Sequence, residues 1–189
     1  GVRVLDLTNV LSGPFCTLHL ALLGAEVVKI ENPKDEDLAR KLGNVPKLNQ
    51  QLMGTSFLAQ NANKKSLTLN LKSPEGREIF KRLAAGADVV VENFRPDVKK
   101  RLKIDYKDLK KVNPKIILGS ISGFGQDGPY AGRPGFDQIA QGMGGLMSIT
   151  GLPGQGPVRV GIPIADLSAG LFCALGIMVA LLEREKSKK

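Results

Sequence analysis

Val2-Arg3-Val4-Leu5-Asp6-Leu7 opens the chain with a short apolar run, the pattern of a strand buried inside a sheet. A helix is predicted from about Gly13 to Leu23, with Pro14 in its first turn and Gly24 directly after its end. Glu26 to Ile30 forms the second predicted strand. A strand, a helix and a second strand in immediate succession are typical of a parallel, doubly wound sheet.

The rest of the chain continues this alternation of short apolar runs and helix-forming segments. Further strands are predicted at Phe57–Gln60, Leu67–Leu71, Asp88–Glu92 and Ile116–Ile121. Helices are predicted at Ser73–Ala85, Pro96–Leu102, Tyr106–Val112 and Phe136–Met147, and a loop at Pro33–Gly54. We therefore expect a single α/β domain over residues 1–189, with an open, mostly parallel Rossmann-like sheet and helices on both faces.

A glycine pattern of the dinucleotide-binding type, made by Gly123, Gly125 and Gly128, follows the strand predicted at Ile116–Ile121. In a dinucleotide site a helix must begin directly after these glycines, because its N-terminus holds the pyrophosphate. Pro129 follows here instead of a helix. We therefore expect no nicotinamide cofactor and interpret the glycines as a mobile loop with an exposed backbone.

The most apolar segment runs from Leu167 to Leu182, and Asp166 stands directly before it. Ser168 is its one polar side chain, and small residues recur at helical spacing, which predicts a closely packed helix. The run of about 16 residues is shorter than the ~20 that a membrane span needs, so we expect a buried helix and no membrane partner. Asp166 falls in the first turn, where a carboxylate serves either as a cap or as a functional group.

The sequence has a formal net charge of +9, from 27 basic and 18 acidic residues, and basic residues are densest between Lys99 and Lys115. Nucleic acid is a common partner of such a charge. The basic stretch, however, contains one aromatic residue, Tyr106, and the sequence has no helix-turn-helix, zinc-finger or RNA-recognition motif. We expect no nucleic-acid partner, and the charge suits a solvated surface or an anionic ligand.

The few cysteines and the single histidine limit the chemistry further. Cys16 and Cys173 do not make a disulfide framework and indicate a reducing compartment, for which we expect the cytoplasm, with the mitochondrial matrix as the alternative. His19 stands among leucines on the first predicted helix. We therefore expect neither a metal site nor catalysis by a histidine.

Several motifs occur together along the chain. In order they are Val4-Leu5-Asp6-Leu7-Thr8, Leu23-Gly24-Ala25-Glu26-Val27-Val28-Lys29-Ile30-Glu31, Asn61-Ala62-Asn63-Lys64-Lys65-Ser66, Val91-Glu92-Asn93-Phe94-Arg95-Pro96, Gly123-Phe124-Gly125-Gln126-Asp127-Gly128, Gly135-Phe136-Asp137 and Asp166-Leu167-Ser168-Ala169-Gly170. These motifs resemble those of the family III CoA-transferases, the CaiB/BaiF family, over essentially the whole chain. The resemblance implies CoA transfer from an acyl-CoA to a small carboxylic acid, with coenzyme A as a substrate and no permanently bound cofactor. It also implies an N-terminal CoA-binding domain without the family's C-terminal half, and an interlocked homodimer.

The resemblance also implies roles for individual residues. Asp166 becomes the nucleophile that forms an aspartyl anhydride and then an aspartyl-CoA thioester, shielded by the loop of Gly123 and Gly125. Phe136 and Asp137 belong to the substrate pocket. The implied CoA-binding residues are Lys64, Lys65, Asn93, Phe94, Arg101 and Leu102. Among these, Arg101 offers a forked set of donors for phosphate, and Phe94 and Leu102 can flank the adenine.

Departures from the family pattern leave alternatives open. Leu11 stands where these transferases often have Gln, and Asn32 where they often have Arg, which leaves the acyl specificity open. Phe136 occupies the position of a histidine base in the family's racemases, so a 2-methylacyl-CoA racemase is the less favoured alternative. Arg133 and Arg159 are candidates for binding a second carboxylate of the acid. A truncated CoA-binding or assembly module without catalysis is the remaining alternative.

Overall fold

The computed structural model describes residues 1–187 and contains a five-stranded sheet with the strand order β3-β2-β1-β4-β5. The strands are β1 (Arg3–Asp6), β2 (Glu26–Glu31), β3 (Lys65–Thr68), β4 (Val89–Glu92) and β5 (Ile117–Ser120). Every pairing within the described residues is parallel. The chain direction across the sheet reverses between β1 and β4, so the carboxyl ends of these two strands border the crevice where such sheets bind ligands. The predicted Rossmann-like sheet is confirmed.

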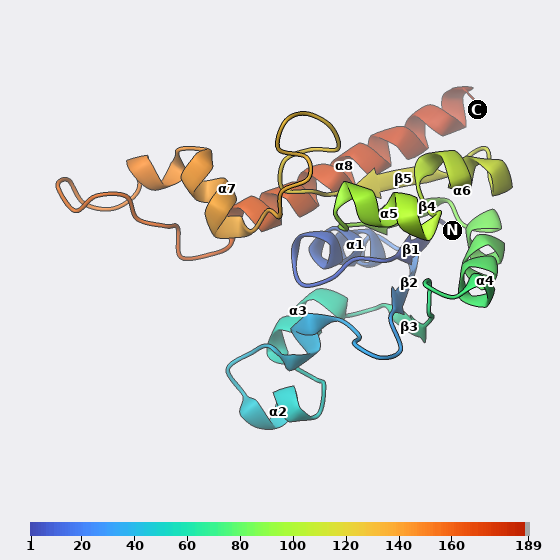
Figure 1. Cartoon of the computed structure of the whole chain (residues 1–189), viewed down its shortest axis with the longest axis horizontal. Coiled ribbons are helices and arrows are strands. Elements are labelled where there is room, and N and C mark those ends of the chain that lie inside the picture. The colour runs from blue at the N-terminus through green and yellow to red at the C-terminus, as the bar shows by residue number, and fades with distance from the viewer. Residues whose placement is uncertain (188–189) are drawn as a thin grey trace.

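Helices cover both faces of the sheet, as predicted (Figure 1). One face is covered by α1 (Ser12–Leu22) and α8 (Ile164–Ser187), and the other by α4 (Pro74–Ala85), α5 (Pro96–Leu102) and α6 (Tyr106–Val112). Each face has its own buried core. Alternation along β4 places Val89 and Val91 in the core under α1 and α8, and Val90 in the core under α4 and α6.

Helices α4, α5 and α6 follow their predicted bounds because local signals determine where they begin. Ser73 caps α4, since its Oγ accepts the N–H of Gly76 at 3.0 Å. Asp105 caps α6 in the same way, with Oδ1 3.1 Å from the N–H of Asp108. Pro96 begins α5, where its missing N–H costs no hydrogen bond.

Two predictions for the first third of the chain are wrong. The strand predicted at Phe57–Gln60 lies within α3 (Thr55–Asn61), because a run of three apolar residues fits a helix as well as a strand. The Phe57 ring packs under the Arg40 guanidinium, whose central carbon lies 3.8 Å from the ring centroid. The loop predicted at Pro33–Gly54 contains the 3-10 helix η1 (Leu38–Lys41) and α2 (Pro46–Gln50).

The helix predicted from Phe136 to Met147 is also too long. Helix α7 (Asp137–Met143) is followed by Gly144 as its C-cap. The next residue, Gly145, has φ +81°, a left-handed conformation that ends a helix. A short 3-10 helix, η2 (Leu146–Ile149), follows. Figure 1 shows α7 at the N-terminal end of α8, beyond the edge of the sheet.

Helix α8 is buried along one stripe only, so the prediction of a buried helix is half correct. Gly170, Ala174 and Ile177 face the sheet and α1, whereas Phe172 is 73% exposed and Val179 is 63% exposed. By length and composition α8 is the one helix within residues 1–187 that could cross a membrane, a test that core helices of soluble proteins also pass. The structure thus leaves a long apolar helix face uncovered.

Candidate active site

Asp166 lies in the first turn of α8, and a second carboxylate holds that turn in place. Asp137, the first residue of α7, accepts hydrogen bonds at Oδ1 from the N–H groups of Ala165 (2.9 Å) and Asp166 (3.3 Å). The side chain is only 9% exposed. Asp137 was predicted to belong to the substrate pocket, and in the structure its carboxylate accepts hydrogen bonds from the free N–H groups at the start of α8. Asp137 therefore holds the backbone of the turn that carries Asp166.

Gln141, which the sequence analysis did not single out, completes this support. Its Nε2 donates to Asp137 Oδ2 at 2.6 Å, and its Oε1 accepts the N–H of Val160 at 2.8 Å. Gln141 is buried and lies one helical turn after Asp137. A polar pair at i and i+4 on one short helix is the sequence signal that could have identified it.

The environment of Asp166 disfavours its ionised form. Burial raises the pKa of this carboxyl above its ordinary value, and the negative charge of Asp137 raises that pKa further. The dipole of the helix start favours the carboxylate and opposes both effects. A carboxylate that is poorly solvated and poorly stabilised is a better nucleophile than one in water, which suits covalent catalysis.

A cavity of about 180 Å³ opens in front of Asp166. Its wall includes Ser12, Asn93, Gly123, Phe136 and Ala169. Three of the predicted site residues, Asn93, Gly123 and Phe136, are thus brought to Asp166. Phe136 is 68% exposed, so its ring borders the opening of the cavity.

The glycine loop is fixed at its base by a contact between two backbones. A Cβ added at Gly123 would lie 2.3 Å from the Cα of Gly135, so neither position has room for a side chain. Further along, Gln126 is bound by the ammonium group of the buried Lys99. Gly125 has φ +84° and does not line the cavity. The loop that was predicted to be mobile is therefore tied at two points.

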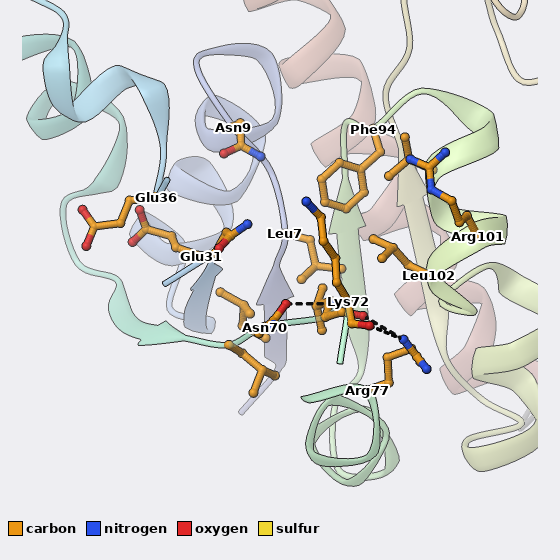
Figure 2. Close-up of a pocket in the computed structure, with 15 residues that line it drawn as sticks. Leu7, Asn9, Glu31, Glu36, Asn70, Lys72, Arg77, Phe94, Arg101 and Leu102 are labelled. Carbon is orange, nitrogen blue, oxygen red and sulfur yellow. Dashed lines mark hydrogen bonds between the residues drawn. The ribbon is translucent and has the colours of Figure 1, made fainter. Parts of the chain in front are cut away.

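A second, larger cavity of about 440 Å³ lies at the carboxyl ends of β1 and β2 (Figure 2). It contains Phe94, Arg101 and Leu102, which the sequence analysis assigned together to CoA. Leu7 and Ile30 add an apolar wall. An apolar slot with a guanidinium at its edge can hold a flat base and a phosphate.

Two further cations line this larger cavity that the sequence analysis did not identify. Lys72, on the segment that follows β3, and Arg77, on α4, line it together with Arg101 (Figure 2). The Arg77 guanidinium donates to the carbonyl oxygen of Lys72 at 2.8 Å and so holds that segment. The signal that could have found Lys72 is its place shortly after a strand of a parallel sheet, where ligand-binding loops lie.

Asn93 separates the two cavities. Its Oδ1 accepts the N–H of Asn9 at 2.8 Å, and its Nδ2 donates to the carbonyl oxygen of Asn9 at 2.7 Å. Asn93 lines the cavity of Asp166, whereas Asn9 and Phe94 line the larger one. A ligand that occupied both cavities would pass this pair of asparagines.

Lys64 and Lys65 lie outside both cavities. The Lys64 side chain is 2% exposed, and its Nζ lies 3.0 Å from Asp6 Oδ2 and 2.8 Å from Thr17 Oγ1. Lys65 is exposed and pairs with Glu26 at 2.5 Å, near the amino end of β2. The geometry thus gives both lysines contacts within the fold and places neither beside Asp166.

Comparison with known proteins is in agreement with this geometry. Residues 1–189 match the family model described as CoA-transferase family III. Succinyl-CoA:glutarate CoA-transferase from Mus musculus is 48% identical over 189 residues, which cover 100% of this chain and 43% of that protein. Acetyl-CoA:oxalate CoA-transferase from Acetobacter aceti is 46% identical over 190 residues, which cover 100% of this chain and 48% of that protein. The crystal structure of a CaiB/BaiF family protein from Brucella suis superposes with a TM-score of 0.92 at 39% identity, covering 100% of this chain and 50% of that one.

The chain spans about half the length of the curated relatives it matches. The family model matches every residue of this chain, and the matched crystal structure has the same fold. Sequence, fold and motif order therefore agree. This chain belongs to CoA-transferase family III, the family of the CaiB/BaiF proteins.

Proposed function

We propose that this chain is the CoA-binding domain of an acyl-CoA:carboxylate CoA-transferase and that Asp166 is its nucleophile. The observation that carries the proposal is a partly buried carboxylate of raised pKa at a cavity, one asparagine pair away from a larger cavity lined by cations. Family membership supports the same reaction class. The proposal needs no metal, because the carboxylate itself forms the covalent bond.

The reaction follows from the chemistry of a carboxylate and a thioester. An oxygen of Asp166 attacks the thioester carbon, the carbon–sulfur bond breaks, and CoA leaves as a thiolate, so that the acyl group remains on Asp166 as a mixed anhydride. The thiolate then attacks the aspartyl carbonyl, which releases the first acid as a carboxylate and forms an aspartyl-CoA thioester. The incoming acid repeats both steps in reverse and leaves as the new acyl-CoA, with Asp166 regenerated.

The larger cavity is the proposed site of the nucleotide end of CoA. Phe94 and Leu102 offer apolar surface for the adenine, and Arg101 and Lys72 offer positive charge for the phosphates. The Arg101 guanidinium is 67% exposed and pairs with Asp97 at 3.3 Å, so it can turn to a phosphate at small cost. The pantetheine arm would then extend past Asn93 toward Asp166.

We propose a small dicarboxylate as the acid acceptor. The relatives from Mus musculus and Acetobacter aceti act, by their names, on glutarate and on oxalate. Arg133 and Arg159 remain the candidates for the second carboxylate, and Arg159 stands beside Val160, the residue that Gln141 holds near the start of α8. Competing glutarate against butyrate as acceptors tests this, because Arg159→Gln should weaken the preference for the diacid and leave butyrate unaffected.

The single experiment that tests the proposed function is an intact-mass measurement of the whole protein with succinyl-CoA. A covalent CoA adduct that hydroxylamine removes is expected, and Asp166→Ala should not form it. Glu78→Ala, which changes an exposed carboxylate on α4, is the matched control and should form the adduct normally. A folded protein without any adduct would favour the alternative of a CoA-binding module.

We also propose that the exposed face of α8 is covered in the assembled enzyme by the half of the family fold that lies outside these residues, within a homodimer. The support is the long apolar face itself and the relatives' greater length. Uncovered apolar surface of this extent usually marks an interface.

A further inference from the structure

The turn between β1 and α1 contains a residue in a strained backbone conformation. Val10 has φ +68°, in the left-handed region. Branching at Cβ makes this region unfavourable for valine, and such outliers persist only where the surrounding structure enforces them. The turn Thr8–Leu11 is therefore held from outside.

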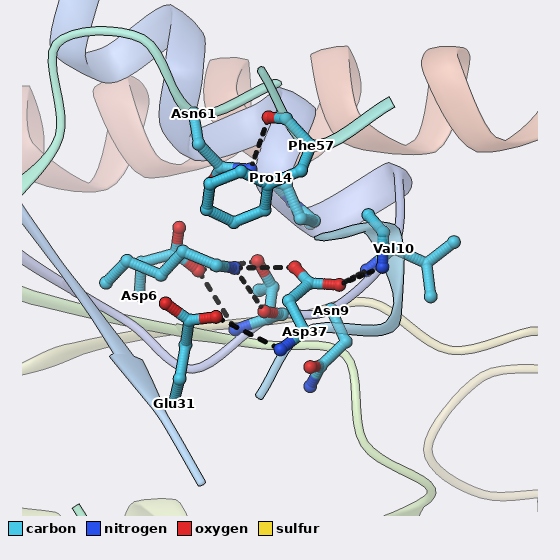
Figure 3. A network of polar contacts seen from close by, with 12 residues as sticks. Asp6, Asn9, Val10, Pro14, Glu31, Asp37, Phe57 and Asn61 are labelled. Atoms are coloured by element: carbon cyan, nitrogen blue, oxygen red, sulfur yellow. Dashed lines mark hydrogen bonds and ion pairs between the residues drawn. The ribbon is translucent and has the colours of Figure 1, made fainter. Parts of the chain in front are cut away.

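Three side chains from three other segments hold this turn by its backbone. Lys29 on β2 donates from Nζ to the carbonyl oxygen of Thr8 at 2.8 Å. Asn93, after β4, bonds both backbone groups of Asn9. Asp37, before η1, accepts the N–H of Val10 at Oδ1 at 2.9 Å, a contact visible in Figure 3. Every residue from Thr8 to Val10 is thus fixed by a separate side chain.

Two of these three side chains also form an ion pair with each other. Lys29 Nζ lies 2.9 Å from Asp37 Oδ2, and the two side chains are 1% and 0% exposed. Neither residue lines the two cavities. A buried ion pair contributes little net stability compared with apolar residues of the same size, so its value must be sought in the geometry that it enforces.

The position of the turn relates this geometry to the reaction. Asn9 lines the larger cavity, and Ser12, which begins α1 directly after the turn, lines the cavity of Asp166. The turn is therefore part of the wall past which the proposed pantetheine arm must reach Asp166. A displacement of about 1 Å at such a place can cost about 100-fold in rate.

We propose that Lys29 and Asp37 are positioning residues, which hold the turn Thr8–Leu11 in its strained form so that the thioester meets Asp166. The inference rests on the proposed function. Breaking the ion pair should release Val10 to a negative φ and move the wall between the cavities. The nucleotide end of CoA, which is bound by Phe94 and Arg101, should be affected little.

The test compares kcat and KM for acyl-CoA in the whole protein and its variants. Asp37→Asn should lower kcat about 10- to 100-fold while KM changes much less. Adding Val10→Gly to Asp37→Asn should restore much of kcat, because glycine adopts a positive φ without the contacts from Lys29 and Asp37. Asp88→Asn, which breaks the partly buried pair with Arg184 at the amino end of β4, is the matched control and should leave kcat unchanged.

A merely structural role for the ion pair predicts different results. In that case Asp37→Asn would lower the melting temperature as Asp88→Asn does, kcat would stay at its original value, and Val10→Gly would rescue nothing; this outcome overturns the proposal. Should Asp37→Asn not fold, Lys29→Met/Asp37→Leu replaces the pair without leaving a buried charge and is read in the same way.

Hydrogen exchange separates this proposal from the proposed function. Amides of residues 8–12 should exchange faster in Asp37→Asn than in the original protein, whether or not the protein transfers CoA. An original protein that forms no adduct refutes the proposed function. An active Asp37→Asn variant with unchanged exchange in the turn refutes the positioning role alone.

Discussion

At the scale of a single residue, Asp166 is subject to effects that raise the pKa of its carboxyl and to effects that lower it. Burial and the neighbouring Asp137 raise the pKa of its carboxyl, while the first turn of α8 provides backbone N–H groups and a favourable dipole. Asp137 has two effects, because it anchors the turn through Oδ1 and repels the charge that Asp166 must carry. The same residue therefore positions the proposed nucleophile and destabilises its ionised form.

This conflict predicts a specific pH dependence. In the proposed mechanism the ionised Asp166 attacks, so kcat/KM should rise with pH through a pKa that lies above the ordinary range near 4. Asp137→Asn keeps a side-chain oxygen for the helix start and removes the negative charge, so the acid limb of the pH profile should move to lower pH. Glu78→Gln, at an exposed position on α4, serves as the control, and an acid limb that stays in place in Asp137→Asn would contradict the assignment.

Replacing Asp166 by asparagine should abolish activity but raise the stability of the fold at neutral pH. A carboxyl whose pKa is raised on folding contributes stability below its unfolded pKa, and that contribution is lost as pH rises through the folded value. Asp166→Asn removes the ionised form and should therefore raise the melting temperature at pH 7, by about 2 °C. The gain should vanish near pH 3, where both proteins are neutral at this position. Thermal unfolding of the inactive variant at the two pH values measures it.

Glycines set the distances between elements at two places in this fold. At Gly123 the loop after β5 touches the segment before α7, and at Gly170 helix α8 touches the backbone of α1. A Cβ at Gly170 would lie 2.5 Å from the carbonyl oxygen of Ser12. Since Ser12 and Asp166 line the same cavity, this helix contact also sets the width of the proposed site.

Two glycines on α8 therefore predict opposite results for the same substitution. Gly170→Ala should lower the free energy of unfolding by about 1–3 kcal/mol, because the helices must separate to admit a methyl group. Gly176→Ala meets nothing within 4 Å and should raise it by up to about 1 kcal/mol through helix propensity. Urea denaturation measures both. Equal effects of the two substitutions would show that the contact at Gly170 is unimportant.

The glycine loop offers a second matched pair. Gly123→Ala should cost about 1–3 kcal/mol and also suppress the CoA adduct, because the crossing with Gly135 borders the cavity of Asp166. Gly132→Ala, where a Cβ would meet nothing within 4 Å, should change neither property measurably. Intact mass and urea denaturation on the same samples give both readouts. A normal adduct in a folded Gly123→Ala protein would remove the loop from the site.

At the scale of the whole molecule, the apolar face of α8 is the feature that the fold leaves uncovered. Phe172, Leu175, Val179 and Leu182 are all more than half exposed on this one helix. The chain also spans about half the length of its curated relatives. Both observations suit a domain that is completed by further protein.

The isolated 189 residues should therefore behave differently from a chain that includes the rest of the family fold. We expect the short chain to bind a hydrophobic dye strongly and to self-associate, and Phe172→Ser/Val179→Ser to reduce both effects. The longer chain should bind little dye and form a dimer in light scattering. Strong dye binding by the longer chain would show that the face remains uncovered there.

The sequence by itself determined the elements with local signals and the groups that are candidates for the site. Proline and capping side chains placed α4, α5 and α6, and short apolar runs placed β1, β2 and β4, because these signals act over a few residues. Asp166 was recognised from its position at the start of an apolar helix together with the motif order. The grouping of Phe94, Arg101 and Leu102 was predicted by resemblance, and the structure places all three in one cavity.

Only the tertiary structure decided how the polar side chains are used. Lys64 and Asp137 had the chemistry of ligand-binding groups, but the fold buries one against Asp6 and directs the other to the start of α8. The contacts that hold Val10 in its left-handed conformation could not be predicted, because Lys29 and Asp37 lie 19 and 27 residues after Val10 along the chain. Such contacts depend on which strand ends become neighbours, and sheet order is a property of the whole chain. The sequence thus determined which groups are present, and packing decided which of them face the site.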